Sequence, residues 1–318
     1  MKYNIKNIFN NRIVVLILLL ILTIVIMSIL SPYFLTYYNI MQILRFGCVL
    51  ALVSIGENLV ILAGKGGIDL SVGSIISLSG IILIVLYKYL GINIPLSIII
   101  VLIFGIILGL VNAVQVVLFN IPPLIATLGT LYMYGGLALV IAKTGSISGF
   151  PEYFSFLGQG EIFGIPTQIL LFLLPISFIT ILIMKNTSFG RNIYLIGINN
   201  DSARFAGINF NKIRILLYSY SGFLAALGGI IMASWFMTAK ADVGKDIEMQ
   251  AITVVMLGGT SIKGGVGSVV GTLISVLIIT MISTGLQLAQ INSIWQMAVL
   301  GTILLITVIF NKKIEIKD

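Results

Sequence analysis

Long apolar stretches dominate the chain, and short polar or glycine-rich segments separate them. Most stretches approach the roughly 20 residues that an α-helix needs to cross a bilayer. The pattern therefore predicts an all-α, polytopic membrane protein of about ten spans, in one membrane domain covering residues 1–318. The expected spans are residues 13–30, 40–63, 70–89, 95–119, 123–142, 166–184, 213–238, 249–258, 267–288 and 292–310.

Two glycine-rich segments do not fit straight helices. Residues 64–73 contain several glycines, and the short run 249–258 continues into a second glycine-rich segment, 258–267. Backbone groups freed by a break are tolerated at membrane depth only where protein or a wet cavity satisfies them. We therefore expect broken or re-entrant helices at both places.

Composition supports a membrane protein. Charged residues make up 9% of the chain and hydrophobic residues 59%, whereas a soluble domain has about 25% charged residues. The net charge of +8 does not indicate nucleic-acid binding, because 13 of the 18 basic residues fall on one predicted side. Lys and Arg accumulate in cytoplasmic loops, so both termini are expected in the cytoplasm. The longest predicted outer loop, 144–165, carries two acids and no basic residue.

Several kinds of chemistry are excluded by what the chain lacks. It has no His and a single cysteine, Cys48, so neither a His-based catalytic pair nor a His-based zinc site is available. No GxxxxGK[ST] segment is present to bind a nucleotide phosphate. We expect no catalytic residue, no metal and no cofactor in this chain.

The longest polar segment on the predicted inner side is 186–212. Asn200 or Asp201 is expected to cap a short helix over 201–206, and Gly207 to end it in a left-handed conformation. Such a short helix is not stable alone in water. Its apolar residues, Phe205 and Ile208, must rest either on a partner or on the protein's own inner face.

Five motifs, in order along the chain, resemble those of the ribose-type sugar ABC transporter permeases. They are Phe34-Leu35-Thr36 with Asn39-Ile40, residues 66–74 (GGIDLSVGS), residues 123–130 (PLIATLGT), residues 190–209 (GRNIYLIG followed by NNDSARFAGIN), and residues 258–268 with their glycines. The resemblance extends from about residue 30 to residue 310. Gly64 and Lys65 depart from the family pattern, as extra residues before Gly66.

The resemblance implies an ABC importer permease fold and several partners. Two ATP-binding cassette subunits, which bind ATP and magnesium, would dock on residues 186–212, the cytoplasmic coupling loop. A second permease copy (identical or a paralogue) and an extracytoplasmic sugar-binding protein would complete the transporter in the bacterial cytoplasmic membrane. The residues implied in coupling are Asn199, Asn200, Asp201, Ala203, Arg204, Phe205, Ala206, Gly207 and Ile208.

Polar and glycine residues near the first break are the candidates for the translocation path: Glu57, Asn58, Gly67, Asp69, Ser71, Gly73, Ser74, Thr127 and Thr130. Ionisable groups inside a bilayer are costly and often functional. Glu57 either lines the path or bonds Asn58, and Asp69 either caps the third span or contacts sugar hydroxyls. Arg45 is expected to extend to the headgroups. Other polar residues, Asn112 and Gln287 among them, are expected to pack between helices.

Two other functions remain open from the residues. An ion-coupled secondary transporter also has broken helices, with Glu57 as its candidate coupling group. Within the ABC class, the cargo is expected to be a pentose or hexose, with a sugar-derived signalling molecule or a nucleoside as the alternative. An intramembrane enzyme is disfavoured because only Asp69 among the aspartates lies near a span.

Overall fold

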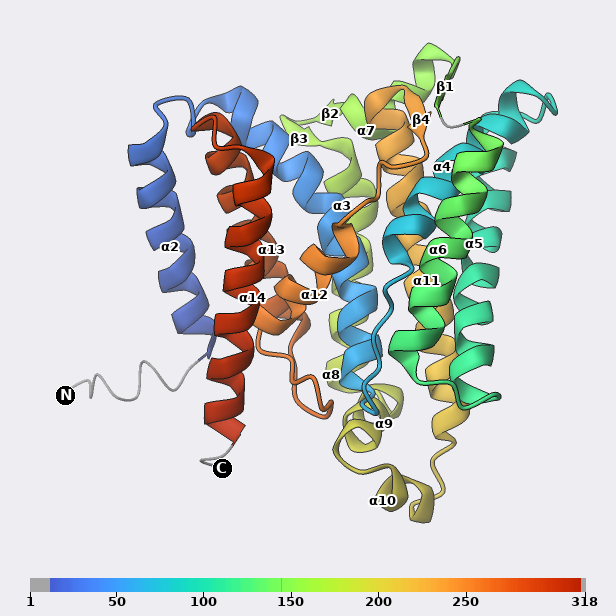
Figure 1. Cartoon of the computed structure of the whole chain (residues 1–318), viewed down its shortest axis with the longest axis vertical. Helices are drawn as coiled ribbons and strands as arrows, with labels where there is room; N and C mark the ends of the chain where they lie inside the picture. Colours follow the sequence, from blue (N-terminus) through green and yellow to red (C-terminus); the bar gives the residue numbers. More distant parts are fainter. Residues whose placement is uncertain (1–11, 144, 316–318) are drawn as a thin grey trace.

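The computed structural model describes residues 12–143 and 145–315, and it is built almost entirely of helices (Figure 1). Within these residues, seven helical segments are long and apolar enough to cross a membrane. They are α2 (Arg12–Leu30), α3 (Tyr37–Leu62), α5 (Ile94–Val117), α6 (Pro123–Ile141), η2 (Ile169–Leu173) continuing into α8 (Leu174–Asn186), α11 (Phe210–Phe236) and α13 (Val269–Leu288).

Three further helices are apolar: α4 (Val72–Lys88), α12 (Ile247–Leu257) and α14 (Ser293–Glu315). Each of the ten predicted spans therefore coincides with one helix or, for the sixth, with η2 and α8 together. Lys2, Lys6 and Lys317, which contribute to the predicted inner positive charge, lie outside the described residues.

Short elements collect at the two ends of the helix bundle (Figure 1). At one end, β1 (Ser146–Ser148) pairs antiparallel with β4 (Thr238–Lys240), and β2 (Glu161–Ile162) pairs with β3 (Ile165–Pro166). η1 (Glu152–Ser155) and α7 (Phe156–Gln159) lie there too, and we call this the β end. The opposite end carries α9 (Ser188–Ile198) and α10 (Asn200–Phe205), and we call it the α10 end.

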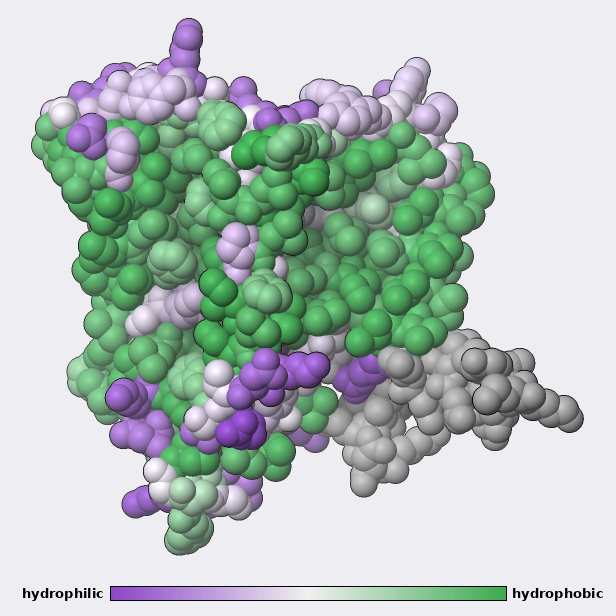
Figure 2. All heavy atoms as spheres, turned by 180° about the vertical axis from the view of Figure 1, so that it is seen from behind, coloured by the Kyte–Doolittle hydropathy of each residue, from purple (hydrophilic) through white to green (hydrophobic). Residues whose placement is uncertain are grey.

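The centre of the bundle is formed by α3 and α11, which are buried along most of their length. By contrast, α2, α5 and α6 bury one face and expose large aliphatic side chains on the other. Figure 2 shows the result as a broad hydrophobic belt between two more hydrophilic ends. A belt of this kind matches the hydrocarbon layer of a bilayer.

Glycines allow α5 and α11 to approach closely. Gly105 and Gly109 lie one turn apart on α5, and a Cβ on either would collide with α11, at Gly222 O or Tyr218 O. A Cβ on Gly222 would in turn collide with Gly105 O. Small residues four apart permit this backbone contact in membranes, where association depends on van der Waals packing.

Both predicted helix breaks are present. Between α3 and α4 the chain leaves helical geometry, with positive φ at Gly64, Lys65 and Gly66 (72°, 58° and 66°). The second glycine-rich segment, 258–267, follows α12 and has positive φ at Gly259, Gly264 and Gly265. These left-handed positions favour glycine, and Lys65 is the exception.

The amino ends of α4 and α12 meet inside the bundle. A Cβ on Gly244, just before α12, would collide with Gly73 O in the first turn of α4, and Gly244 N donates to Ser77 Oγ at 3.0 Å. At this level Ile76 O touches Gly229 of α11, seven residues before the helix ends at Phe236. The meeting point therefore lies about 10 Å inside the β end of α11.

Arg45, which the sequence predicts to extend to the headgroups, reaches the loop at the β end. Its Nη2 lies 3.0 Å from Glu161 Oε1 and donates to Gln159 O at 2.7 Å. The guanidinium therefore has partners in the loop at the β end, and its predicted extension to the headgroups stays a prediction. This long-range pair was not visible in the sequence because 116 residues separate its partners.

The close contact of α5 and α11 yields a stability prediction. Replacing Gly222 with Ala should lower the free energy of unfolding by about 1–3 kcal/mol, because the added methyl group meets backbone that cannot move aside. Thermal unfolding in detergent checks this. The control is Gly129→Ala in α6, where a Cβ would meet open space; equal unfolding temperatures for the two variants would contradict the packing argument.

Candidate functional site

The carboxylate of Asp69 is the centre of a fully buried hydrogen-bond network. Its Oδ1 accepts from Ser71 N (3.1 Å), Ser71 Oγ (2.7 Å) and Asn112 Nδ2 (3.2 Å), and its Oδ2 accepts from Ser221 Oγ (3.2 Å). These donors come from the first break, α5 and α11. One side chain therefore ties three segments together at the depth where α4 begins.

Glu57 supports the same break from α3. Both of its carboxylate oxygens accept the Asp69 backbone N–H, at 3.1 and 3.2 Å. We call the set Glu57, Asp69, Ser71, Asn112, Thr130 and Ser221 the Asp69 network, since Thr130 Oγ1 also donates to Asn112 Oδ1 at 2.6 Å. No bond between Glu57 and Asn58 is present in the described structure, so one of the two alternatives for Glu57 is wrong.

The other path candidates surround this network. Thr127 Oγ1 donates to Ile68 O (3.3 Å) and Pro123 O (2.8 Å), and Ser74 Oγ donates to Ser71 O (2.7 Å). Gly67 N donates to Gly64 O at 3.1 Å. Asn58 faces away from Asp69: its Nδ2 donates to Thr272 Oγ1 (2.9 Å), and its Oδ1 accepts from Thr260 Oγ1 (3.0 Å).

Asp69 does not cap α4 in the usual way. The N-cap residue of α4 is Ser71, whose side chain makes no capping bond. Asp69 accepts the Ser71 N–H, one position before the helix, so its role extends across the break to α5 and α11. The contacts of Asp69 are thus structural, and a direct role of this side chain in the translocation path stays a prediction.

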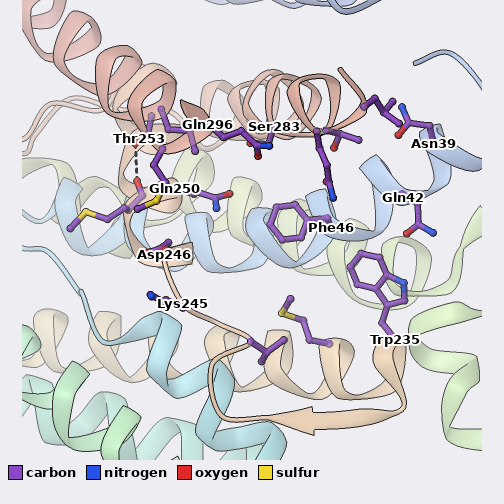
Figure 3. Close-up of a pocket in the computed structure, with 18 of the residues that line it drawn as sticks. Asn39, Gln42, Phe46, Trp235, Lys245, Asp246, Gln250, Thr253, Ser283 and Gln296 are labelled. Atoms are coloured by element: carbon purple, nitrogen blue, oxygen red, sulfur yellow. Dashed lines mark hydrogen bonds between the residues drawn. The ribbon is translucent and has the colours of Figure 1, made fainter. Parts of the chain in front are cut away.

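A separate cavity of about 1210 Å³ lies between α3, α11, α12, α13 and α14 (Figure 3). None of the nine path candidates lines it. Its polar lining consists of Asn39, Gln42, Lys245, Asp246, Gln250, Thr253, Ser283, Thr284, Gln287 and Gln296. Sequence reasoning missed this site and assigned Gln287 to helix packing. One feature of the sequence could have indicated the cavity: α3, α12, α13 and α14 are mainly apolar, yet each contains a glutamine that lines it.

Two polar atoms of the residues that line this cavity lack a hydrogen-bond partner within the described structure. Gln250 Oε1 and Ser283 Oγ are buried and have no hydrogen-bond partner among the described residues. Leaving a buried polar group unpaired costs roughly 1–3 kcal/mol. Both residues line the cavity although these two oxygen atoms are turned away from it, so a change of side-chain rotamer would bring unused hydrogen-bonding capacity to the wall.

At the α10 end, residues Asn200–Phe205 form the short helix that the sequence predicts, but Asn199 caps it. Asn199 Oδ1 accepts from Asp201 N (2.9 Å) and Ser202 N (3.1 Å), so the expected cap at Asn200 or Asp201 was wrong by one or two positions. Gly207 ends the helix with φ 75°, as predicted.

The exposed face of this loop carries Phe205, which is 91% exposed, together with Asp201, Arg204, Ala206 and Gly207. Ala203 is buried and Ile208 is half-buried. Asn200 Oδ1 accepts from Arg214 Nη2 (2.8 Å), which also donates to Ala63 O (3.1 Å). The loop is thereby fixed to α11 and to the end of α3.

Backbone contacts connect α9 to both glycine-rich segments. A Cβ on Gly197 would collide with Leu62 O and Gly265 N, and Gly264 lies against Gly64. Gly265 N donates to Leu62 O at 2.9 Å. We call Gly64, Gly197, Gly264 and Gly265 the glycine junction.

Tyr194 adds a side-chain bond at the same place. Its hydroxyl donates to Gly267 O at 3.1 Å. Burial raises the pKa of this hydroxyl, so it remains a neutral donor at physiological pH. Within the described residues, no group of three or more His, Cys, Asp or Glu side chains is placed to hold a metal ion.

Known proteins resemble the chain over nearly its whole length. The family model described as branched-chain amino acid transport system / permease component matches residues 39–308. The ribose import permease protein RbsC of Bacillus subtilis (strain 168) is 38% identical over 292 residues, covering 91% of this chain and 89% of the relative. The autoinducer 2 import system permease protein LsrD of Photorhabdus laumondii is 39% identical over 270 residues, covering 83% and 80%. No solved structure matches.

The Asp69 network yields a second stability prediction. Ser221→Ala leaves Asp69 Oδ2 without its donor and should lower the free energy of unfolding by about 1–3 kcal/mol. Asp69→Ala removes the acceptor of several donors and should lower the free energy of unfolding further. Ser79→Ala is the matched control, because Ser79 Oγ is buried without a partner in the described part of the chain. Thermal unfolding that ranks Ser79→Ala as the more damaging serine variant would contradict this account.

Proposed function

Because this chain belongs to the family of ABC transporter permeases of the ribose type, we propose that it forms the membrane-spanning subunit of an ATP-driven importer for a monosaccharide. Residues 186–212 serve as its cytoplasmic coupling loop. Two ATP-binding cassette subunits, which bind ATP and magnesium, drive transport with the free energy of ATP hydrolysis. An extracytoplasmic binding protein delivers the sugar.

The observation that carries this proposal is the shape of the coupling loop. A capped, anchored helix of six residues presents Phe205 almost fully to solvent at the extremity of the molecule (Figure 1). An exposed aromatic side chain on a fixed support is the kind of residue that anchors a protein interface when it enters a pocket. Asp201 and Arg204 flank it as polar rim contacts.

The glycine junction supports a route from this loop into the membrane. Because Gly197 touches Leu62 O and Gly265 N directly, no flexible side chain separates α9 from the end of α3 or from residues 258–267. A displacement of α9 must therefore move both broken segments. Closely packed elements of this kind shift between discrete arrangements rather than deform continuously.

The distribution of charge supports the proposed sidedness. Lys185, Arg191, Arg204, Lys212 and Lys263 lie in segments at the α10 end, whereas Glu152 and Glu161 lie at the β end. The positive-inside rule then assigns the α10 end to the cytoplasm of a bacterial cell. Since α2 begins and α14 ends towards this same end (Figure 1), both termini are assigned to the cytoplasm.

A second permease copy is supported by Lys245. This side chain is exposed, yet it follows Gly244, which lies about 10 Å inside the β end of α11. Lys245 lines the cavity, and a lysine that faced hydrocarbon at this depth would cost roughly 2.5–3.5 kcal/mol. A second copy, identical or a paralogue, would enclose this face and keep Lys245 in a wet central space.

The cargo has one alternative. A relative named as an autoinducer 2 permease is as similar to this chain as one named for ribose, so a sugar-derived signalling molecule remains the second candidate. Purified complex with its ATPase and binding protein, reconstituted in liposomes, should take up radiolabelled ribose only when ATP is inside. Uptake by this chain alone, driven by an ion gradient, would contradict the proposal.

Phe205→Asp should abolish docking of the ATPase. Loss of a buried aromatic anchor costs about 2 kcal/mol or more, so co-purification and uptake should fall at least about 30-fold. Co-purification on the tagged permease measures this. The matched control is Phe163→Asp, because Phe163 is 97% exposed at the β end; it should leave ATPase binding unchanged. Equal binding by both variants would refute the assignment of the coupling loop.

Gly197→Ala should uncouple ATP hydrolysis from transport. The methyl group forces α9 away from Leu62 and Gly265, while Phe205 remains available to the ATPase. We expect retained co-purification and ATP hydrolysis, with uptake reduced at least about tenfold, compared with Gly136→Ala, where a Cβ meets open space. Uptake equal to that of the unmodified complex would contradict transmission through the glycine junction.

A further inference from the structure

The cavity between α3, α11, α12, α13 and α14 contains a built set of hydrogen-bonding groups. Asp246 is the N-cap residue of α12, and Gln250 follows in the first turn of that helix. Both line the cavity, as does Ser283 of α13 on another wall. Figure 3 shows Gln250 extending from α12 towards Phe46 of α3.

These groups are not engaged by the protein itself. Gln250 Oε1 and Ser283 Oγ have no partner in the described residues, and Asp246, the N-cap residue of α12, makes no side-chain capping bond. Asp246 is held at φ 66°, in the left-handed region. Rotation of the Gln250 and Ser283 side chains would turn these oxygens into the cavity, where an occupant that supplies hydrogen bonds would remove the cost of leaving them unpaired.

The chemistry of the lining selects one class of occupant. A carboxylate and amide oxygens accept hydrogen bonds, while the Ser283 hydroxyl and the amide NH2 groups donate them. Hydroxyl groups do both, so a polyhydroxylated molecule can satisfy the wall at several points. Phe46 and Trp235 also line the cavity and offer apolar faces to the C–H groups of a sugar ring.

The same lining disfavours a branched aliphatic amino acid. Its side chain would leave Gln250 Oε1 and Ser283 Oγ unpaired, and a site built for hydrogen bonding strongly rejects a ligand that lacks the partner group. The cavity volume of about 1210 Å³ exceeds the 300–1,000 Å³ of ordinary ligand pockets. A sugar would therefore share the space with water and bind weakly. Weak binding allows a transported sugar to be released.

We propose that Asp246, Gln250 and Ser283 form a hydroxyl-recognition site that a sugar contacts on its way through the permease. This site depends on the proposed function, because it requires that the sugar enters the permease from the β end. It is separate from the Asp69 network, whose polar groups are already satisfied by one another.

Transport by the complete complex tests the site. Gln250→Ala and Ser283→Ala should each lower the maximal rate of D-ribose uptake about five- to tenfold, as expected for one lost hydrogen bond. The double variant should lose more. Co-purification with the ATPase and hydrolysis of ATP without binding protein should not change. The matched control is Gln115→Ala, which removes a glutamine side chain from α5, outside the cavity.

A labelling experiment gives a second measurement that does not depend on turnover. Cys48 is the only cysteine of this chain and is buried, so Gln250→Cys introduces one accessible thiol into the permease subunit. A membrane-impermeant thiol reagent added from the β side should modify it, and D-ribose with the binding protein should slow the reaction whereas L-leucine should not. Absence of labelling, or protection by leucine but not by ribose, would overturn the proposal.

The two proposals fail in different ways. If the unmodified complex transports ribose and the double variant Gln250→Ala, Ser283→Ala does so equally well, the recognition site is wrong and the importer function stands. If the unmodified complex imports neither ribose nor autoinducer 2 with ATP present, the proposed function itself is wrong.

Discussion

The need to satisfy backbone groups inside a bilayer governs this structure. A helix that breaks within the hydrocarbon layer exposes N–H and C=O groups that no water can reach. At the break before α4, Glu57 accepts the N–H of Asp69 and Asp69 accepts the N–H of Ser71. At the second glycine-rich segment, Gly265 N–H bonds Leu62 O at the end of α3. Carboxylates in the membrane are expensive, and here they are retained because they replace the partners that an unbroken helix would provide.

The same constraint places the two breaks next to α9. Backbone can bond backbone across segments only where the segments approach without side chains between them, and this explains the glycine junction. Gly64, Gly197 and Gly264 pack so closely that a methyl group on any of them has no ordinary space. The contact that satisfies the broken segments is therefore also the one through which α9 would move them in the proposed mechanism, so that stability and transmission would depend on the same residues.

The sequence was sufficient for the spans and the two breaks, because each follows from a continuous local pattern of apolar or glycine residues. It was insufficient wherever the decisive partner is distant. Arg45 meets Glu161 across 116 residues, and Glu57 meets the backbone of Asp69 rather than the neighbouring Asn58.

The cap of α10 was misplaced because three polar residues, Asn199, Asn200 and Asp201, stand in a row, and Asn200 is instead engaged by Arg214. The cavity was missed because five helices contribute to it, each with few polar positions.

The Asp69 network and the cavity differ in whether their polar groups have hydrogen-bond partners. The Asp69 network is buried and its carboxylate oxygens have donors from three segments, so a sugar entering there would have to break bonds before forming new ones. The cavity differs, since its lining residues Gln250 and Ser283 each carry a buried oxygen that has no hydrogen-bond partner among the described residues. A transport path must bind its cargo enough to admit it and weakly enough to release it. Isolated, unpaired groups in a wide cavity meet that requirement, whereas a fully bonded carboxylate cluster meets the requirement of a frame around which the path can open.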